Sequence, residues 1–169
     1  KSGPSLEGVL VEAGSGDDVV GVTEESGIRV FVDTSGQPYF ELWHEDGQVV
    51  TEPVAGPWAW STDSFVHVAA TYDGEEARVW VNGVLAGEVT EATLPNMGYT
   101  DFDHAWIFGG HYSGTGGSAS VDTGWTGVID NIRVSDVNRY PTSCNPPSGF
   151  SVDGSTLALF TIGEEEGNF

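Results

Sequence analysis

Apolar residues occur in short runs in which β-branched and aromatic side chains alternate with polar ones, and no long segment has the period of about 3.6 residues that marks a helix. Turn residues, chiefly Gly, Asp, Asn and Ser, separate these runs. Regular spacing of this kind is typical of an all-β fold, and we predict a two-sheet antiparallel jelly-roll sandwich with no substantial helix. The predicted strands are residues 8–12, 19–23, 28–33, 38–44, 48–51, 65–72, 77–82, 84–89, 105–109, 126–134 and 155–161.

The clearest local pattern is a double hairpin. Residues 65–72 and 77–81 are rich in aromatic and β-branched side chains, which favour strands. Gly74, between these runs, takes a positive φ at no steric cost and so suits a tight turn. Asn82 and Gly83 fit a two-residue type I′ turn, which leads into a third strand. The stretch therefore predicts three consecutive antiparallel strands.

Three stretches are predicted to be irregular because Gly, Pro, Asn and Ser interrupt them repeatedly: 91–103, 109–124 and 140–149. Long loops on a rigid sandwich are where binding residues usually lie. The last of the three resembles a linker and leads to the final predicted strand. The length fits a single domain over residues 1–169, in which 155–169 supplies a closing strand.

The charge balance is strongly acidic. Twenty-six Asp and Glu residues face five Lys and Arg residues, for a formal net charge of −21. Phosphate binding needs clustered Lys and Arg, so nucleic acid and anionic lipid surfaces are poor partners, and no apolar run is long enough for membrane insertion as a helix. Three interpretations stay open: adaptation to a salty exterior, neutralisation by calcium, or a plain solvated acidic surface. Cys144 is the only cysteine, so no internal disulfide forms.

Several motifs carry a family resemblance: FVHVA at 65–69, TYDG at 71–74, VNG at 81–83, IFGG at 107–110 and GVIDNIRV at 127–134. In these motifs the chain resembles the laminin-G-like, concanavalin-A-like lectin/glucanase jelly-roll domains of bacterial extracellular proteins. The resemblance implies the jelly-roll fold and a place in a larger secreted or cell-surface protein. It does not choose one function, because such scaffolds serve as lectins, adhesins, glycosidase modules and spacers.

The C-terminal stretch LALFTIGEEEGN, at 157–168, resembles the opening strand of that family, which normally comes first. Either the C-terminus supplies this strand here, or the chain runs into a second copy of the domain. We favour the first interpretation, because the stretch before Gly8 is too short to supply the strand.

Asp130 is the first metal candidate. Within the predicted strand 126–134 it shares a face with Val128 and Ile132, and a carboxylate in such an apolar row must be hydrogen-bonded, paired or bound to a metal. The resemblance implies a structural calcium ligand at such a position, with Glu164 as a co-ligand if the last strand pairs with 126–134. A hydrogen-bonded structural carboxylate is the alternative.

Asp101 and Asp103 form a second candidate, because two carboxylates two residues apart in a loop suit the hard oxygen coordination of calcium. Solvated or turn-capping aspartates are the alternative interpretation. No EF-hand loop is present.

Aromatic residues in the predicted loops suggest a glycan-binding surface, because sugar rings present apolar C–H faces that stack on aromatic planes. Packing into the core is the alternative for each of them, and is expected of Trp80 within a strand. The candidate ligand-binding residues are Trp58, Trp60, Tyr99, Trp106, Tyr112 and Trp125.

The sequence lacks the patterns of known catalytic sites on this fold. Retaining glucanases with the jelly-roll fold of the resembled family use the motif Glu-x-Asp-x-x-Glu, which places two carboxylates about 5–5.5 Å apart. The chain contains no such motif. We therefore expect no enzyme but a non-catalytic glycan- or surface-binding module, stabilised by calcium, from a multidomain secreted or cell-surface protein. The first alternative is a structural or adhesion spacer that binds protein or no ligand, and a glycoside hydrolase ranks after it.

Overall fold

The computed structural model describes residues 6–14, 27–44, 47–56, 58, 60, 64–90, 106–113, 120–122 and 125–162. Within these ranges every regular element is a β-strand, and every strand pairing is antiparallel. The predicted all-β antiparallel sandwich is therefore confirmed. The described part of the chain forms no helix with the length and apolarity needed to cross a membrane.

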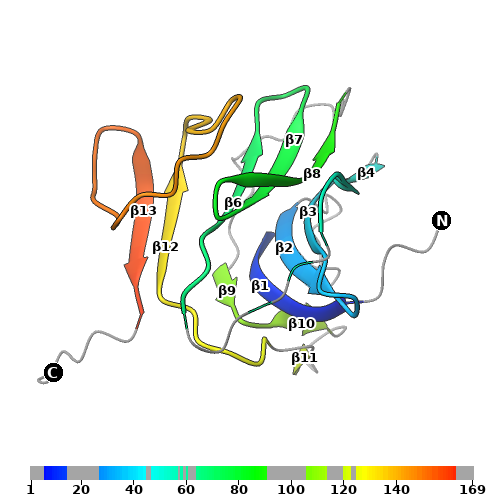
Figure 1. The fold of residues 1–169 in the computed structure, drawn as a ribbon. Helices are drawn as coiled ribbons and strands as arrows, with labels where there is room; N and C mark the ends of the chain where they lie inside the picture. The colour runs from blue at the N-terminus through cyan, green and yellow to red at the C-terminus, as the bar shows by residue number, and fades with distance from the viewer. Residues whose placement is uncertain are drawn as a thin grey trace, which may run out of the picture.

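The first sheet has five strands and contains the N-terminal meander (Figure 1). Between its second and third strands, Asp33 closes the turn: its Oδ1 accepts hydrogen bonds from the main-chain N–H groups of Ser35 and Gln37, at 2.8 and 2.9 Å. Gly36 completes the turn with a φ of 84°, a conformation that glycine adopts without strain. In spatial order the strands are β4 (Gly47–Val50), β3 (Pro38–His44), β2 (Gly27–Asp33), β1 (Leu6–Gly14) and β9 (Trp106–Phe108).

The second sheet has four strands and contains the predicted double hairpin. Asp73 accepts hydrogen bonds from the N–H groups of Glu75 and Glu76 in the first turn. Asn82 and Gly83 have φ values of 48° and 84°, as a type I′ turn requires. In spatial order the strands are β5 (Glu52–Pro53), β8 (Val84–Val89), β7 (Ala77–Val81) and β6 (Val68–Tyr72).

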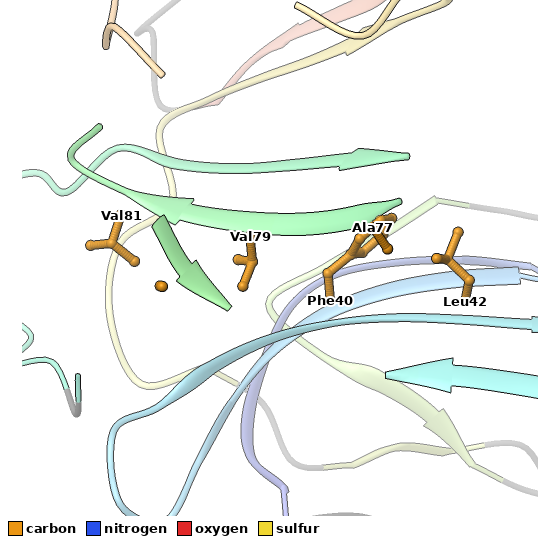
Figure 2. Close-up of a cluster of buried hydrophobic side chains, with 6 residues drawn as sticks. Phe40, Leu42, Ala77, Val79 and Val81 are labelled. Atoms are coloured by element: carbon orange, nitrogen blue, oxygen red, sulfur yellow. The ribbon is translucent and has the colours of Figure 1, made fainter. Parts of the chain in front are cut away.

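The hydrophobic core lies between these two sheets. Phe40 and Leu42 of β3 face Ala77, Val79 and Val81 of β7, as Figure 2 shows. All five side chains are at most 4 % exposed. Because successive residues of a strand point to opposite faces, the neighbours of these residues lie on the outer faces of the two sheets.

Two ribbons complete the described strands. One pairs β10 (His111–Ser113) with β11 (Ser120–Asp122), and the other pairs β12 (Asn131–Ser135) with β13 (Thr156–Thr161). The second pairing joins Asn131 to Thr161 and Val134 to Ala158. The final strand thus runs antiparallel to the strand that carries the GVIDNIRV motif. The boundaries of the domain stay a prediction.

The observed strands differ from the predicted ones mainly at their ends. The ranges 38–44 and 84–89 agree, whereas the strand predicted at 65–72 begins only at Val68 and that at 126–134 only at Asn131. The stretch 109–124, predicted to be a loop, contributes β10 and β11. The predicted strand 19–23 lies outside the described residues.

Candidate functional site

The loop after β5 carries two of the predicted ligand-binding residues. The main-chain N–H of Trp58 and the indole N–H of Trp60 both donate to the carbonyl oxygen of Gly36, at 3.2 and 3.0 Å. The indole N–H of Trp58 donates to the carbonyl oxygen of Ala55 at 3.3 Å. Both rings are half-buried and pack against the core. The loop is therefore tied to the β2–β3 turn, and both indole donors bond within the chain.

Trp125 joins these rings from a distant part of the sequence. Its ring meets that of Trp60 edge to face, with centroids 5.4 Å apart and planes inclined by 77°, an arrangement that aromatic quadrupoles favour. The main-chain N–H of Trp125 donates to the carbonyl oxygen of Gly109 at 2.8 Å, in the turn between β9 and β10. Trp58, Trp60 and Trp125 form what we call the tryptophan cluster.

For the other three predicted ligand-binding residues, the structure describes at most the backbone. Trp106 begins β9 and Tyr112 lies in β10, so their backbones flank the turn that bonds to Trp125. The side chains of both residues, and the whole of Tyr99, lie outside the described part of the chain. A direct ring contact is thus established for Trp60 and Trp125, and Trp58 is connected to Trp60 through the carbonyl oxygen of Gly36 that both bond.

The predicted environment of Asp130 needs a correction. Asp130 is half-buried, but it immediately precedes β12 and does not lie within the strand. Val128, expected beside it in an apolar row, is 77 % exposed. The strand ladder with β13 begins only at Asn131, so Asp130 and Val128 have no cross-strand neighbours in it. The argument for a carboxylate buried in an apolar row therefore does not apply.

The other predicted metal ligands, Asp101, Asp103 and Glu164, lie outside the described residues. Among the residues that are described, no three His, Cys, Asp or Glu side chains gather closely enough to hold a metal ion. Asp130 by itself does not build a calcium site, which needs about 6–8 oxygen ligands.

A row of charged side chains, which the sequence analysis missed, crosses the outer face of the five-stranded sheet. Strand register places Arg29 of β2 between Glu12 of β1 and Glu41 of β3. The Arg29 Nε donates to Glu41 Oε2 at 2.7 Å, and its Nη1 lies 3.7 Å from Glu12 Oε2. Gln48 donates to the other oxygen of Glu41. We call Glu12, Arg29, Glu41 and Gln48 the charged row.

The carboxylates of the charged row are buried: Glu12 is 7 % exposed and Glu41 is 3 % exposed. The Arg29 guanidinium also lies over the Phe31 and Trp43 rings, 5.4 and 5.6 Å from their centroids. Burying two carboxylates is tolerable because a cation lies between them and hydrogen bonds reach both oxygens of Glu41. The available sequence signal was one arginine in a strand flanked by two strands that carry glutamates.

The outer face of the four-stranded sheet contacts the connection between β12 and β13. We call residues 140–150 of this connection the cover segment; the connection runs beside β6 and β7 in Figure 1. Arg78 Nη1 donates to the carbonyl oxygen of Pro141 at 3.0 Å. A Cβ built at Gly83 would lie 2.6 Å from the carbonyl oxygen of Cys144, so only glycine fits this approach.

His67 is the centre of the same contact. Its ring lies 6.0 Å from the rings of both Tyr140 and Phe150, and its Nδ1 is 3.9 Å from Cys144 Sγ. Burial, and secondarily the charge of Arg133, lower the pKa of His67 below its ordinary value. Burial raises the pKa of the Cys144 thiol. The contact therefore holds a neutral imidazole against a neutral thiol, as expected for a packed histidine.

A comparison with protein families relates these features to known proteins. The laminin G model described as the concanavalin A-like lectin/glucanases superfamily matches residues 4–143. The chain belongs to this superfamily. Comparisons with curated proteins and with solved structures gave no match. The superfamily match includes the charged row and the tryptophan cluster, but it ends within the cover segment and before β13.

Proposed function

We propose that this concanavalin A-like domain is a non-catalytic module that binds a glycan or another cell-surface ligand. The observation that supports this proposal is the contact between Trp60 and Trp125, which joins two loops from distant parts of the sequence. Their rings are only half-buried, so part of each aromatic surface stays open to solvent. Partly exposed rings that rigid loops hold together suit stacking against the C–H faces of a sugar.

A non-catalytic role is supported by the chemistry of the charged row. A general acid or a nucleophile needs a carboxylate oxygen that can reach the substrate. In Glu41 both oxygens accept hydrogen bonds, from Arg29 and from Gln48, and the residue is buried. Arg29 also lies between the two glutamates, so they do not face each other across an open cleft.

Calcium stabilisation and a place in a larger secreted or cell-surface protein belong to the same proposal. The candidate calcium ligands stay those that the sequence predicts, Asp130, Glu164, Asp101 and Asp103, since calcium prefers oxygen ligands. Because a ligand bound only by the folded state stabilises it, EDTA should lower the melting temperature of calcium-loaded protein. An identical melting temperature with EDTA and with calcium would remove the metal from the proposal.

The binding function is tested on a glycan array in calcium-containing buffer, with three proteins compared. We expect the wild type to bind at least one glycan and Trp125→Ala to lose about tenfold in affinity, in line with the roughly 1–3 kcal/mol that an aromatic side chain contributes when a nucleic-acid base stacks on it. Phe65→Ala serves as the control, because Phe65 is an aromatic residue that is 70 % exposed and lies outside the cluster. Absence of any binding, or equal binding by Trp125→Ala, would refute the role of the cluster.

A structural or adhesion spacer is the second candidate. It is favoured by the internal hydrogen bonds of the Trp58 and Trp60 indoles, which leave neither donor for a ligand. A spacer predicts an empty glycan array together with a large loss of stability in Trp60→Ala, because the ring packs against the core.

A further inference from the structure

No main-chain-to-main-chain hydrogen bond joins the described residues of the cover segment to the four-stranded sheet. The contacts between them include a hydrogen bond from Arg78 to Pro141, a hydrogen bond from the Gly83 N–H to the Cys144 thiol, the ring and thiol contacts of His67, and the close approach at Gly83. No strand ladder joins the segment to the sheet. Its three prolines, Pro141, Pro146 and Pro147, have no N–H group to donate. Local segments held by so few main-chain bonds open at a lower free energy than core strands do.

Among the described residues, two buried polar groups on this outer face have no hydrogen-bond partner. They are the indole Nε1 of Trp80 on β7 and the Oγ1 of Thr71 on β6. Trp80 is only 4 % exposed and Thr71 only 8 % exposed. Register pairs Thr71 with Arg78, so both residues share the face to which Pro141 docks. Trp80 lies on β7 between Arg78 and Gly83, the two positions that the cover segment contacts.

We propose that the cover segment is a reversible cover over a second binding face, which accepts a hydroxyl-rich glycan chain when the segment opens. An unpaired buried donor is costly in the closed state, and this cost lowers the free energy needed to open the segment. In the open state the Trp80 N–H and the Thr71 hydroxyl are free to donate to ligand oxygens. His67 and Arg78, released from the segment, add two further polar groups to the same face.

The ligand class follows from these groups. The face offers an indole ring and neutral or cationic hydrogen-bond donors, and its cation, Arg78, is already paired with Glu76 and Glu88. Neutral sugar hydroxyls supply acceptor oxygens without adding anionic charge to a chain of net charge −21. The inference deepens the proposed binding function, but it uses a face that does not include the tryptophan cluster.

Opening of the segment is measured through Cys144, which is buried and is the only thiol in the chain. Its labelling by a thiol reagent is followed against urea concentration, with global unfolding followed by tryptophan fluorescence. We expect labelling at low urea with a weak urea dependence, since local opening exposes little surface. Labelling that shows the full urea dependence of global unfolding at every concentration would overturn the proposal.

The role of the unpaired donors is tested with two matched threonine variants. Thr71→Val removes the unpaired hydroxyl at nearly constant volume, and should slow Cys144 labelling about tenfold by stabilising the closed state. The control is Thr51→Val, because Thr51 is also buried but its Oγ1 accepts a hydrogen bond from the Phe40 N–H at 3.0 Å. The control should not slow labelling. Unchanged or faster labelling in Thr71→Val would mean that its hydroxyl is satisfied in the closed state.

The ligand is tested with cellohexaose, maltohexaose and xylohexaose at millimolar concentration. A sugar that binds only the open face raises the open fraction, so at least one should speed Cys144 labelling about threefold or more. The effect should persist in Trp125→Ala and disappear in Trp80→Phe. If no sugar changes the labelling rate, the second face is refuted. If the wild type nevertheless binds a glycan on the array and Trp125→Ala does not, the proposed function at the tryptophan cluster still holds.

Discussion

The outer faces of the two sheets differ in whether their buried polar groups have hydrogen-bond partners. On the five-stranded sheet, the charged row gives both oxygens of Glu41 a donor and places Arg29 between two carboxylates. On the four-stranded sheet, Arg78 is paired, but Trp80 Nε1 and Thr71 Oγ1 are buried without a partner. A buried charge network with hydrogen bonds to Glu41 opposes rearrangement, whereas unpaired donors lower the free energy needed to leave the closed arrangement. We therefore expect local opening to cost more free energy at the charged row than at the outer face of the four-stranded sheet.

The largest expected effect comes from breaking the charged row. Arg29→Met leaves two buried glutamates without their shared cation, and removing one partner of a buried pair costs about 3–5 kcal/mol of unfolding free energy. Urea denaturation measures this loss. Replacing all three charges at once, with Glu12→Leu and Glu41→Leu added, should recover most of the stability. A loss below about 1 kcal/mol in Arg29→Met would show that the row is solvated and would end the contrast between the faces.

A smaller effect is expected inside the sandwich. Thr51→Val leaves the buried N–H of Phe40 without the Thr51 oxygen, which should cost about 1–3 kcal/mol of unfolding free energy. Thr71→Val, on the outer face, removes a hydroxyl that has no partner and should cost nothing. Equal losses in both variants, measured by urea denaturation, would show that the two hydroxyls are bonded alike.

The pH dependence of stability should sharpen the contrast further. The pKa of His67 is lowered in the folded protein from its ordinary value of 6.5, so the unfolded chain binds the proton more readily. Stability from this group is therefore fully present above pH 6.5 and is lost as the pH falls below it. The groups around His67 are Arg133 of β12 and Tyr140 and Cys144 of the cover segment.

This pH effect is isolated by comparing wild type with His67→Gln between pH 5 and pH 8. The difference in unfolding free energy should shrink as the pH falls, and Cys144 labelling, corrected for the intrinsic thiolate fraction, should become faster in the wild type. A difference that stays constant with pH would mean that His67 is as exposed as in the unfolded chain.

The smallest effect is expected at the exposed ion pair of Arg139 and Asp153. Two hydrogen bonds of 2.9 and 2.6 Å join them, and the guanidinium holds the pKa of Asp153 well below its usual range. Because the pair is open to solvent, the small destabilisation in Arg139→Met should disappear when salt is raised to 1 M. The loss in Arg29→Met should persist in the same salt, because its partners are buried.

The features that the sequence predicted are the local ones. The turn of Asn82 and Gly83 followed from residues that tolerate positive φ, and the order of strands around it followed from β-branched runs. The contact between Trp60 and Trp125 was only partly predictable, since both were expected near a ligand surface but nothing in the sequence paired their rings.

The features that escaped prediction depend on strand register and on long-range packing. Periodicity assigned Asp130 a face, but it did not show that the ladder begins one residue later. The charged row needed the register of three strands to be known. The Pro-rich stretch within 140–149 resembled a linker, because its docking depends on His67 and Arg78, which lie far away in the sequence.

Gly83 has a role both in the β7–β8 turn and in the contact with the cover segment. It completes the hairpin turn with a φ of 84°, and it also lets the carbonyl oxygen of Cys144 approach its α-carbon closely. Any side chain at this position would strain the turn and push the docked connection outward at the same time. A substitution at Gly83 would therefore disturb the hairpin and the cover segment together, for two independent steric reasons.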